Sequence, residues 1–344
     1  MDGACAGHSD GAQTHQSGFA TLVTRRSGIV RTMLLFCCES PLWTNAAPCP
    51  LLDPVMNMNY VVQQDGRILR DVLRRDMGVS YSAMKSAKWD NRILVDGVPT
   101  PVNAILRAGQ TVTMLWPEEV PVYQLRPYAL DLDIPYEDEH LLVIDKPAPL
   151  ASQSSAGHPD NSLENAVFAY MGCRLDFIYR PVNRLDKGTS GLMVVAKTPH
   201  AQHLLQKQLH TEAFQRVYLA VVEGVPEPMQ GVIDAPIAKV EAASIRRVVC
   251  PEGRPSVTHY QVEQISGQRA LVRLKLETGR THQIRVHMSH LGCPVCGDFL
   301  YGTELPQLPG RFALHSAELV LAHPLTGETL HITSALPKEL SALL

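Results

Sequence analysis

A series of short apolar runs between residues 141 and 322 constrains the fold of this chain most strongly. Their lengths are typical of β-strands. Two helices are also predicted, one over residues 199–210 with Thr198 as N-cap and one over residues 281–291 that ends at Gly292. Strands outnumber helices and do not alternate regularly with them, so we predict an α+β fold with a mixed, largely antiparallel central sheet. The predicted strands are 141–145, 192–196, 217–223, 257–264, 270–277 and 317–322.

Charge is distributed unevenly along the 344 residues, a length that suggests about two domains. The formal net charge is −3, which is not the strongly basic balance of a protein that coats nucleic acid. Residues 59–116, however, hold eight Lys or Arg and five Asp or Glu, a local charge of +3. The rest of the chain holds 23 Lys or Arg and 29 Asp or Glu, a charge of −6. A basic module on a mildly acidic body indicates local contact with phosphates.

The spacing of the cysteines and the lengths of the apolar runs indicate the cellular compartment of the protein. The spacing of the eight cysteines is irregular, and a chain of this length does not need a disulfide framework, so we expect a reducing cytoplasm. The best candidate for a membrane segment, residues 33–38, is far shorter than the ~20 residues of a span. Zinc at Cys293 and Cys296 would need two more ligands at matching spacing, so we predict two structural cysteines and no metal.

The first 55 residues differ from the rest in composition. They are rich in Gly, Ala, Ser, Thr and Pro and show no sustained periodicity. They also lack the basic start and the long apolar core of a signal peptide. We predict that residues 1–55 are disordered or arise from an early start codon, with Met56 or Met58 as the true beginning.

Residues 59–116 are predicted to form a small separate domain. An apolar stripe indicates a helix over residues 67–76, and Ser80 or Ser82 begins a second one. A hairpin follows at residues 93–98, with Asp-Gly as its turn, and then a strand. This order resembles the alpha-L (S4-like) RNA-binding module of ribosomal proteins. The resemblance implies that phosphates are contacted by Arg70, Arg74, Arg75, Lys85 and Lys88. The alternative is that these side chains form an ordinary solvated helix face.

The proline-rich residues 117–130 are predicted to be a linker. The remaining residues, 131–344, contain all the apolar runs described above and are predicted to form the second, larger domain.

A polar turn leads into the apolar run at residues 192–196. Arg184, Leu185 and Asp186 are followed by Thr-Ser-Gly at residues 189–191, so that a carboxylate stands near the end of a strand. By itself, an aspartate in such a setting is usually a turn or cap residue. The whole pattern, however, resembles the Arg-Leu-Asp-x-x-Thr-Ser-Gly motif of the RluA-type pseudouridine synthases. The resemblance implies that Asp186 is the catalytic nucleophile and that residues 131–344 have the pseudouridine synthase fold.

The motif departs from the family at one position. The family usually has a histidine before the arginine, where this chain has Asn183. Asparagine also offers a donor and an acceptor, so we expect altered local hydrogen bonding and retained activity.

Two further segments resemble the same family. Tyr218 lies where the family has a tyrosine that stacks on the target base and helps to move a proton; the alternative is an ordinary core tyrosine. Residues 278–288 resemble the motif Gly-Arg-x-His-Gln-x-Arg, which implies that Arg285 pairs with Asp186. A guanidinium within hydrogen-bond reach would keep a carboxylate ionised in a dry pocket. The alternative is an exposed helical arginine with a packed stem.

The resemblance extends over residues 59–338 and implies contacts with the substrate. Lys146, in a Lys-Pro pair after the strand 141–145, either contacts the substrate or caps that strand. Arg184 is placed to fill the space that a flipped uridine vacates. The predicted substrate-binding residues are Arg184, Lys146, Arg280, His282 and Gln283.

The predicted reaction is the isomerisation of uridine to pseudouridine in RNA, with large-subunit ribosomal RNA favoured over transfer RNA. No atom is gained or lost, and the sequence has neither a P-loop nor a dinucleotide fingerprint, so no cofactor is predicted. We expect a monomer without a membrane partner. Attack by Asp186 on the sugar and abstraction of a sugar proton to form a glycal both remain open. The alternatives are an RNA-binding protein with an inactive site, a carboxylate-dependent N-glycosidase, and a zinc or redox protein.

Overall fold

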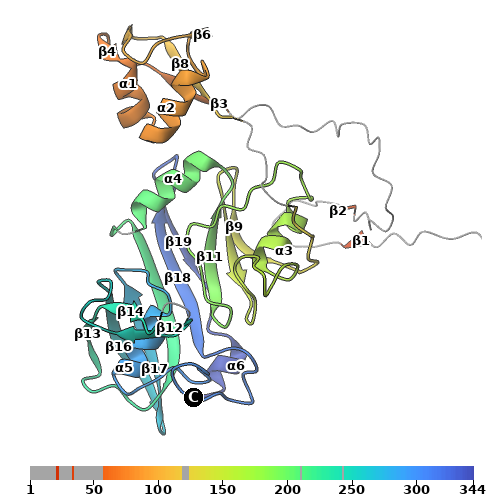
Figure 1. The fold of residues 1–344 in the computed structure, drawn as a ribbon, viewed down its shortest axis with the longest axis vertical. Helices are drawn as coiled ribbons and strands as arrows, with labels where there is room; N and C mark the ends of the chain where they lie inside the picture. Colours follow the sequence, from red (N-terminus) through yellow and green to blue (C-terminus); the bar gives the residue numbers. More distant parts are fainter. Residues whose placement is uncertain (1–20, 23–32, 35–56, 118–123, 210, 242–243) are drawn as a thin grey trace, which may run out of the picture. The chain divides into compact units, whose positions relative to one another are not determined.

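The computed structural model describes residues 21–22, 33–34, 57–117, 124–209, 211–241 and 244–344 (Figure 1). The chain divides into two units, Met1–Asp53 and Pro54–Leu344. In the first unit, the described strands β1 (Thr21–Leu22) and β2 (Met33–Leu34) pair antiparallel. The prediction for residues 1–55 otherwise falls outside the described residues.

Residues 57–116 build a small hydrophobic core between short helices and strands. Leu69, Val72 and Leu73 from the predicted helical stripe are fully buried, together with Met84 and Ala87 of the second helix. The stripe is helical only from Leu69 onwards, because Arg67–Ile68 pairs as a strand and Ile68 has extended backbone. The elements are β3 (Asn57–Val61), β4 (Arg67–Ile68), α1 (Leu69–Asp71), the π-helical turn η1 (Val72–Asp76), α2 (Tyr81–Trp89), β5 (Ile93–Val95), β6 (Val98–Pro99), β7 (Ile105–Leu106) and β8 (Thr111–Leu115).

The predicted Asp-Gly hairpin is present in this core. Val95 pairs with Val98, and the two residues between them, Asp96 and Gly97, have φ values of +50° and +80°. Positive φ at both central positions is the requirement of a type I′ turn, which Asp-Gly satisfies at low cost. Ser80 caps α2 by accepting a hydrogen bond from the Ala83 N–H, as expected of an N-cap serine.

A nine-stranded mixed sheet organises the rest of the chain. Its strand order is β13-β16-β17-β12-β18-β11-β10-β9, and β19 pairs with β18. Within it, β11 and β18 run parallel and the other described pairs run antiparallel. The strands are β9 (Asp133–Glu137), β10 (Leu141–Lys146), β11 (Ser190–Ala196), β12 (Phe214–Glu223), β13 (Gln230–Asp234), β16 (Val257–Ser266), β17 (Arg269–Leu276), β18 (Leu314–Ala322) and β19 (Thr329–Thr333); β14 (Ile237–Lys239) and β15 (Arg247–Val249) form a separate hairpin.

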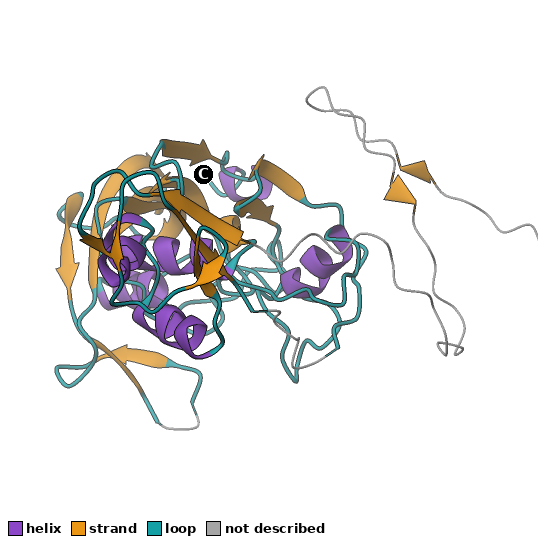
Figure 2. Ribbon diagram, turned by 90° about the horizontal axis from the view of Figure 1, so that it is seen from above, coloured by secondary structure: helices purple, strands orange, loops and turns teal. Residues whose placement is uncertain are grey.

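Few helices accompany this sheet in the described residues, so the predicted α+β class with a mixed sheet is confirmed (Figure 2). Helix α4 (Pro199–Gln208) begins as predicted, with the Thr198 hydroxyl accepting from the Ala201 N–H. Helix α5 (Gln283–His290) begins two residues later than predicted, because His282 has a left-handed backbone with φ +60°. Helices α3 (Leu163–Tyr170) and α6 (Lys338–Ser341) were not predicted.

The sheet is buried on both faces at its centre. All seven residues of β11 are buried, and their side chains divide between two apolar clusters that lie on opposite faces of the sheet. Such a strand is a rigid support for the loop that precedes it. None of the helices in the described part of the chain has the length and apolar character needed to cross a membrane.

Candidate active site

Asp186 stands on a tight turn that leads directly into β11. The backbone carbonyl of Asp186 accepts a hydrogen bond from the Thr189 N–H at 3.0 Å, which closes the turn. The backbone of the preceding residue, Leu185, is held by two hydrogen bonds to the Ser152 hydroxyl, which donates to the Leu185 carbonyl and accepts from the Leu185 N–H. The Asp186 side chain keeps 29% of its surface exposed. The carboxylate of Asp186 therefore reaches solvent from a backbone that is held in place.

Lys146 joins this turn to the end of β10. Its ammonium group is buried and donates to the carbonyls of Pro147, Leu150 and Lys187 at 3.0, 2.8 and 3.5 Å. Burial lowers the pKa of Lys146 to about 7, although the nearby Asp186 charge opposes this shift. Of the two roles considered for Lys146, this geometry favours the one in which it holds the strand end and the turn together.

Arg285 connects Asp186 to a second carboxylate. Its Nη1 lies 3.1 Å from Asp186 Oδ2, while Nε and Nη2 donate to the two oxygens of Asp298 at 2.6 and 2.8 Å. Burial opposes the charge of Arg285, but the hydrogen bonds and charges of Asp298 and Asp186 raise its pKa above the usual value. The guanidinium is therefore a fixed positive charge with one side directed at Asp186.

Aromatic rings surround the same guanidinium. The centroids of Phe312, Tyr301 and Phe299 lie 4.1, 5.0 and 5.8 Å from Arg285 Cζ. Gly188, on the Asp186 turn, leaves room for Phe312, since a side-chain carbon there would lie 2.6 Å from that ring. These contacts exclude water from part of the ion pair, which strengthens the electrostatic interaction.

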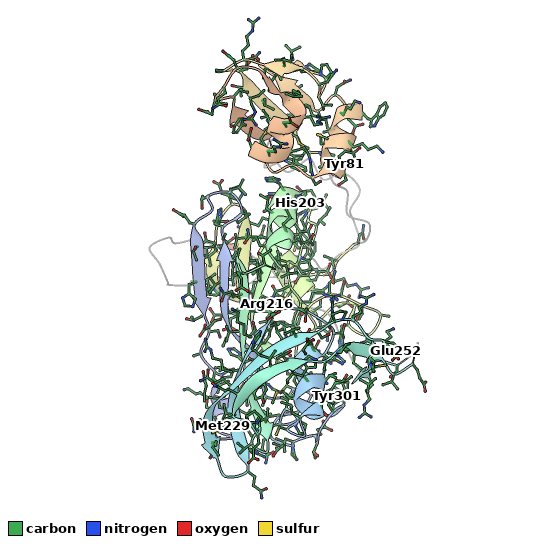
Figure 3. The ribbon with its side chains drawn as sticks, turned by 90° about the vertical axis from the view of Figure 1, so that its left-hand side faces the viewer. Tyr81, His203, Arg216, Met229, Glu252 and Tyr301 are labelled. Carbon is green, nitrogen blue, oxygen red and sulfur yellow. The ribbon has the colours of Figure 1, made fainter. Side chains whose placement is uncertain are left out.

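His282 approaches Asp186 from the start of α5. Its Nε2 lies 3.9 Å from Asp186 Oδ2, and its Nδ1 lies 2.8 Å from the Tyr301 hydroxyl (Figure 3 labels Tyr301). The same hydroxyl accepts a hydrogen bond from the Arg247 N–H. Burial lowers the pKa of His282, so the ring is mostly neutral at pH 7 in spite of the neighbouring carboxylate. A neutral imidazole beside Asp186 leaves Arg285 as the permanent cation in contact with that carboxylate.

Tyr218 lies on β12 between β18 and β17, where it pairs with Ser316 and Leu274. It is 6% exposed, and burial raises the pKa of its hydroxyl. The charge of Asp186 adds to this rise. The structure thus brings Arg285 into contact with Asp186 from a separate segment, and the place of Tyr218 in the same site stays a prediction.

The other predicted substrate-binding residues have different surroundings. Arg184 is exposed, and Arg280 is half-buried with its Nε donating to the Pro255 carbonyl. Gln283 is buried and bonds to Thr258 and Thr278 and to the backbone of residues 257 and 280. These hydrogen bonds use both ends of the amide, so Gln283 braces the loop before α5.

Asn183, which replaces the family histidine, is also buried. Its Oδ1 accepts from the Val194 N–H at 2.8 Å, and its Nδ2 has no hydrogen-bond partner among the described residues. The side chain therefore ties the segment before Arg184 to β11 through a single hydrogen bond.

The sequence did not reveal Asp298, Tyr301 or Phe312 as parts of this site. Asp298 is completely buried, and its Oδ1 also accepts from the N–H groups of Leu300 and Tyr301. The available signal was the place of this aspartate between the apolar pairs Val295-Cys296 and Phe299-Leu300, because a carboxylate is seldom fully buried without a partner. A buried carboxylate needs a charged partner, and here that partner is Arg285.

Cys293 and Cys296 are both buried, and burial raises the pKa of each thiol. Protonated, buried thiols pack as small apolar groups. Among the described residues, no group of three or more His, Cys, Asp or Glu side chains has an arrangement that could hold a metal ion.

Comparisons with known proteins identify relatives of this chain. The family model described as RNA pseudouridylate synthase matches residues 140–290. An RNA pseudouridine synthase of Bacillus subtilis, named as uncharacterized, is 39% identical over 271 residues, which are 78% of this chain and 95% of that protein. Ribosomal large subunit pseudouridine synthase D of Xanthomonas campestris is 37% identical over 291 residues, 80% of this chain and 87% of that protein.

A solved structure shows the same fold. Human RNA pseudouridylate synthase domain containing 1 superposes with a TM-score of 0.50 at 26% identity, covering 60% of this chain and 83% of the human chain. The fold, the site and these relatives define the protein as an RNA pseudouridine synthase, an isomerase. Within that class, the chain belongs to the RluA family.

Proposed function

We propose that this enzyme converts uridines of large-subunit ribosomal RNA to pseudouridine, with Asp186 as the catalytic carboxylate. The observation that carries the proposal is the 3.1 Å contact between Arg285 Nη1 and Asp186 Oδ2. The pair holds a partly exposed carboxylate against a permanent positive charge at the edge of a buried aromatic cluster. Relatives named ribosomal large subunit pseudouridine synthase D support the choice of ribosomal RNA.

In the proposed mechanism, the target uridine leaves its stack and enters the site at Asp186. The bond between ribose C1′ and uracil N1 breaks, and a bond between C1′ and C5 forms after the base rotates. The proton on C5 is lost and N1 gains one, so the reaction balances without a cofactor. Asp186 either attacks C1′ or takes a proton from the sugar, and in both routes the hydrogen bond from Arg285 orients its carboxylate.

Tyr218 and Arg184 have supporting roles in this proposal. The raised pKa of Tyr218 keeps its hydroxyl protonated near neutral pH, so the ring offers a stacking face and a hydrogen-bond donor to the detached uracil. Arg184 is exposed two residues before Asp186 and occupies the space that the flipped nucleotide leaves. Arg280 and His282 lie beside the site and contact the flanking RNA.

The small domain supplies additional RNA contacts in the proposed organisation. We assign residues 59–116 to an S4-like module, residues 117–130 to a linker and residues 131–344 to the catalytic domain. The predicted phosphate-binding side chains Arg70, Arg74, Arg75, Lys85 and Lys88 are all exposed, and Arg70 also lies 3.6 Å from the Asp71 carboxylate. Arg74 also donates to the Val79 carbonyl, so it orders the chain between the two helices as well.

The test is a carbodiimide-based map of pseudouridine in total RNA from cells with and without this gene. Loss of one or a few sites in large-subunit ribosomal RNA, restored by the wild-type protein and not by Asp186→Asn, is the expected result. The purified Asp186→Asn variant should retain RNA binding, since the amide keeps the shape of the carboxylate. An unchanged map would contradict the proposal, and release of free uracil would indicate an N-glycosidase instead.

A further inference from the structure

Helix α2 of the small domain exposes two large aromatic side chains. Tyr81 is 65% exposed and Trp89 is 73% exposed, at the two ends of the helix (Figure 3 labels Tyr81). Other positions of the helix, Met84 and Ala87, are buried in the small core. The two rings are thus not needed for the packing of the domain and are free to contact a partner.

Two lysines share this side of the helix with the rings. At 100° per residue, Lys88, Tyr81, Lys85 and Trp89 fall within an arc of about 100°. Lys88 Nζ lies 5.6 Å from the centroid of the Trp89 ring. We name these four exposed residues the α2 face. It carries no acidic residue, and neither of its lysines forms an ion pair with a described residue.

Other cations of the small domain form ion pairs with carboxylates. Arg67 pairs with Asp76 at 2.6 Å, and Arg92 pairs with Asp90 at 2.6 Å. A positive charge that is already neutralised contributes less to the binding of an anion. The α2 face therefore combines free positive charge with flat apolar surface.

A shallow hollow of about 200 Å³ adjoins Lys88. Asn91 and Thr100 contribute polar groups to its lining, and the Asn91 side chain makes no hydrogen bond to a described residue. Donors and acceptors beside an exposed ring are suited to the edge or ribose of a stacked nucleotide.

These observations favour one kind of partner. In a symmetric dimer formed through two copies of the α2 face, the lysines of one copy would lie opposite the lysines of the other. The repulsion between these like charges costs free energy. A polyanion with accessible flat groups satisfies both parts of the surface, and a single-stranded RNA segment is such a partner. In duplex RNA the faces of the bases are covered by their neighbours, so the rings would find nothing to stack on.

We propose that the α2 face binds unstacked nucleotides of RNA, with Trp89 and Tyr81 stacking on bases while Lys85 and Lys88 contact the adjoining phosphates. This inference rests on the proposed function only in taking the partner to be RNA. It adds to the five predicted phosphate contacts a surface that recognises single-stranded RNA by stacking.

The test measures the affinity of the full-length protein for labelled RNA by fluorescence anisotropy. The probe is a mixed-sequence single strand of about 20 nucleotides, longer than the ~16 nucleotides that a typical single-strand binding fold covers. The same strand annealed to its complement is the second probe. Trp89→Ala should weaken binding of the single strand about tenfold and Trp89→Phe should restore most of it, because stacking is worth roughly 1–3 kcal/mol per base.

Matched variants control for folding and for general loss of apolar surface. Tyr81→Ala and Tyr81→Phe repeat the comparison at the other end of the helix. Ile105→Ala removes an apolar side chain that is 74% exposed elsewhere in the same domain, and it should bind like the wild type. Affinity for the duplex should change much less in the Trp89 variants than affinity for the single strand.

Three outcomes would overturn the inference. These are unchanged affinity of Trp89→Ala and Tyr81→Ala for the single strand, equal losses for both probes, or a change of oligomeric state without a change of RNA affinity. The outcome is separable from that of the proposed function. A wild-type protein that forms no pseudouridine would contradict the proposed function while leaving the stacking measurement intact.

Discussion

Arg285 and Asp298 form a bidentate ion pair in which neither side chain is more than 3% exposed. The pair uses Nε and Nη2 of the guanidinium, so Nη1 is left to reach Asp186 at 3.1 Å. The orientation of the group that touches the proposed nucleophile is therefore set by a carboxylate on a different loop. We regard Asp298 as a positioning residue.

Asp298→Asn should lower the turnover of pseudouridine formation by about 10²-fold, because a displacement of about 1 Å in a catalytic group has this order of effect. RNA affinity should stay near the wild-type value, since Asp298 is buried and does not face the solvent. Single-turnover rates at saturating RNA, measured together with binding, separate the two quantities.

The same variant leaves Arg285 with fewer partners, and breaking a buried pair costs about 3–5 kcal/mol of unfolding free energy. The double variant Asp298→Asn with Arg285→Met should recover part of this stability and none of the activity. If the double variant is as active as the wild type, the proposed role of the Arg285–Asp298 pair is wrong.

Gly191→Ala should prevent stable folding of the catalytic domain. Gly191 has φ +108°, and an added side-chain carbon would overlap the backbone of Ser316 across the parallel pair β11–β18. We expect a loss of at least about 4 kcal/mol, an exceptional value for one substitution. Gly267→Ala, with φ +58° and open space around it, should lose only ~1–2 kcal/mol. Equal losses in urea denaturation would argue against the steric explanation.

Lys146 should make the stability of the protein rise with pH above neutrality. Its pKa is about 7 in the folded chain, against an ordinary value of 10.5. Between these two values the unfolded chain binds one more proton than the folded chain, so the free energy of unfolding increases with pH through this group. Lys146→Met should flatten the rise between pH 7 and pH 9 in urea titrations, while Lys207→Met on α4, where the lysine is exposed, should leave it unchanged.

Arg184→Ala should affect paired targets more than unpaired ones. If Arg184 fills the space of the flipped uridine, its loss removes part of the compensation for unstacking, which costs a few kcal/mol in a helix. The catalytic efficiency should fall about tenfold or more for a uridine in a duplex and much less for one in a loop. Lys187→Ala removes another exposed cation from the same turn and serves as the control. Equal losses on both substrates would indicate a simple phosphate contact.

Six of the nine strands of the large sheet were predictable because their residues carry local signals, whereas β9, β13 and β19 were not predicted. The apolar runs at β10, β11, β12, β16, β17 and β18 were all predicted within a few residues of their observed bounds. Helix α3 was missed although Ser162 and Asn165 form a capping box there, because asparagine replaces the usual Glu or Gln at the third helical position.

The residues of the site were predictable where they belong to sequence motifs of the family. Asp186, Tyr218 and Arg285 were predicted to lie together, and the structure brings Arg285 into contact with Asp186 across 99 positions of sequence. Their catalytic roles stay predictions. Lys146 illustrates the limit, because its sequence neighbours allowed two roles and only its three carbonyl acceptors favour the structural one.

The sequence by itself determined the family, the turn that carries Asp186 and the strands that support it, since each depends on residues that are neighbours along the chain. Only the tertiary structure decided that Asp298 orients Arg285, that Phe312 and Tyr301 enclose the guanidinium, and that Gln283 is a buried brace. The reason is physical. The burial and pairing of a charge depend on groups that folding brings together from distant segments, and no local pattern specifies them.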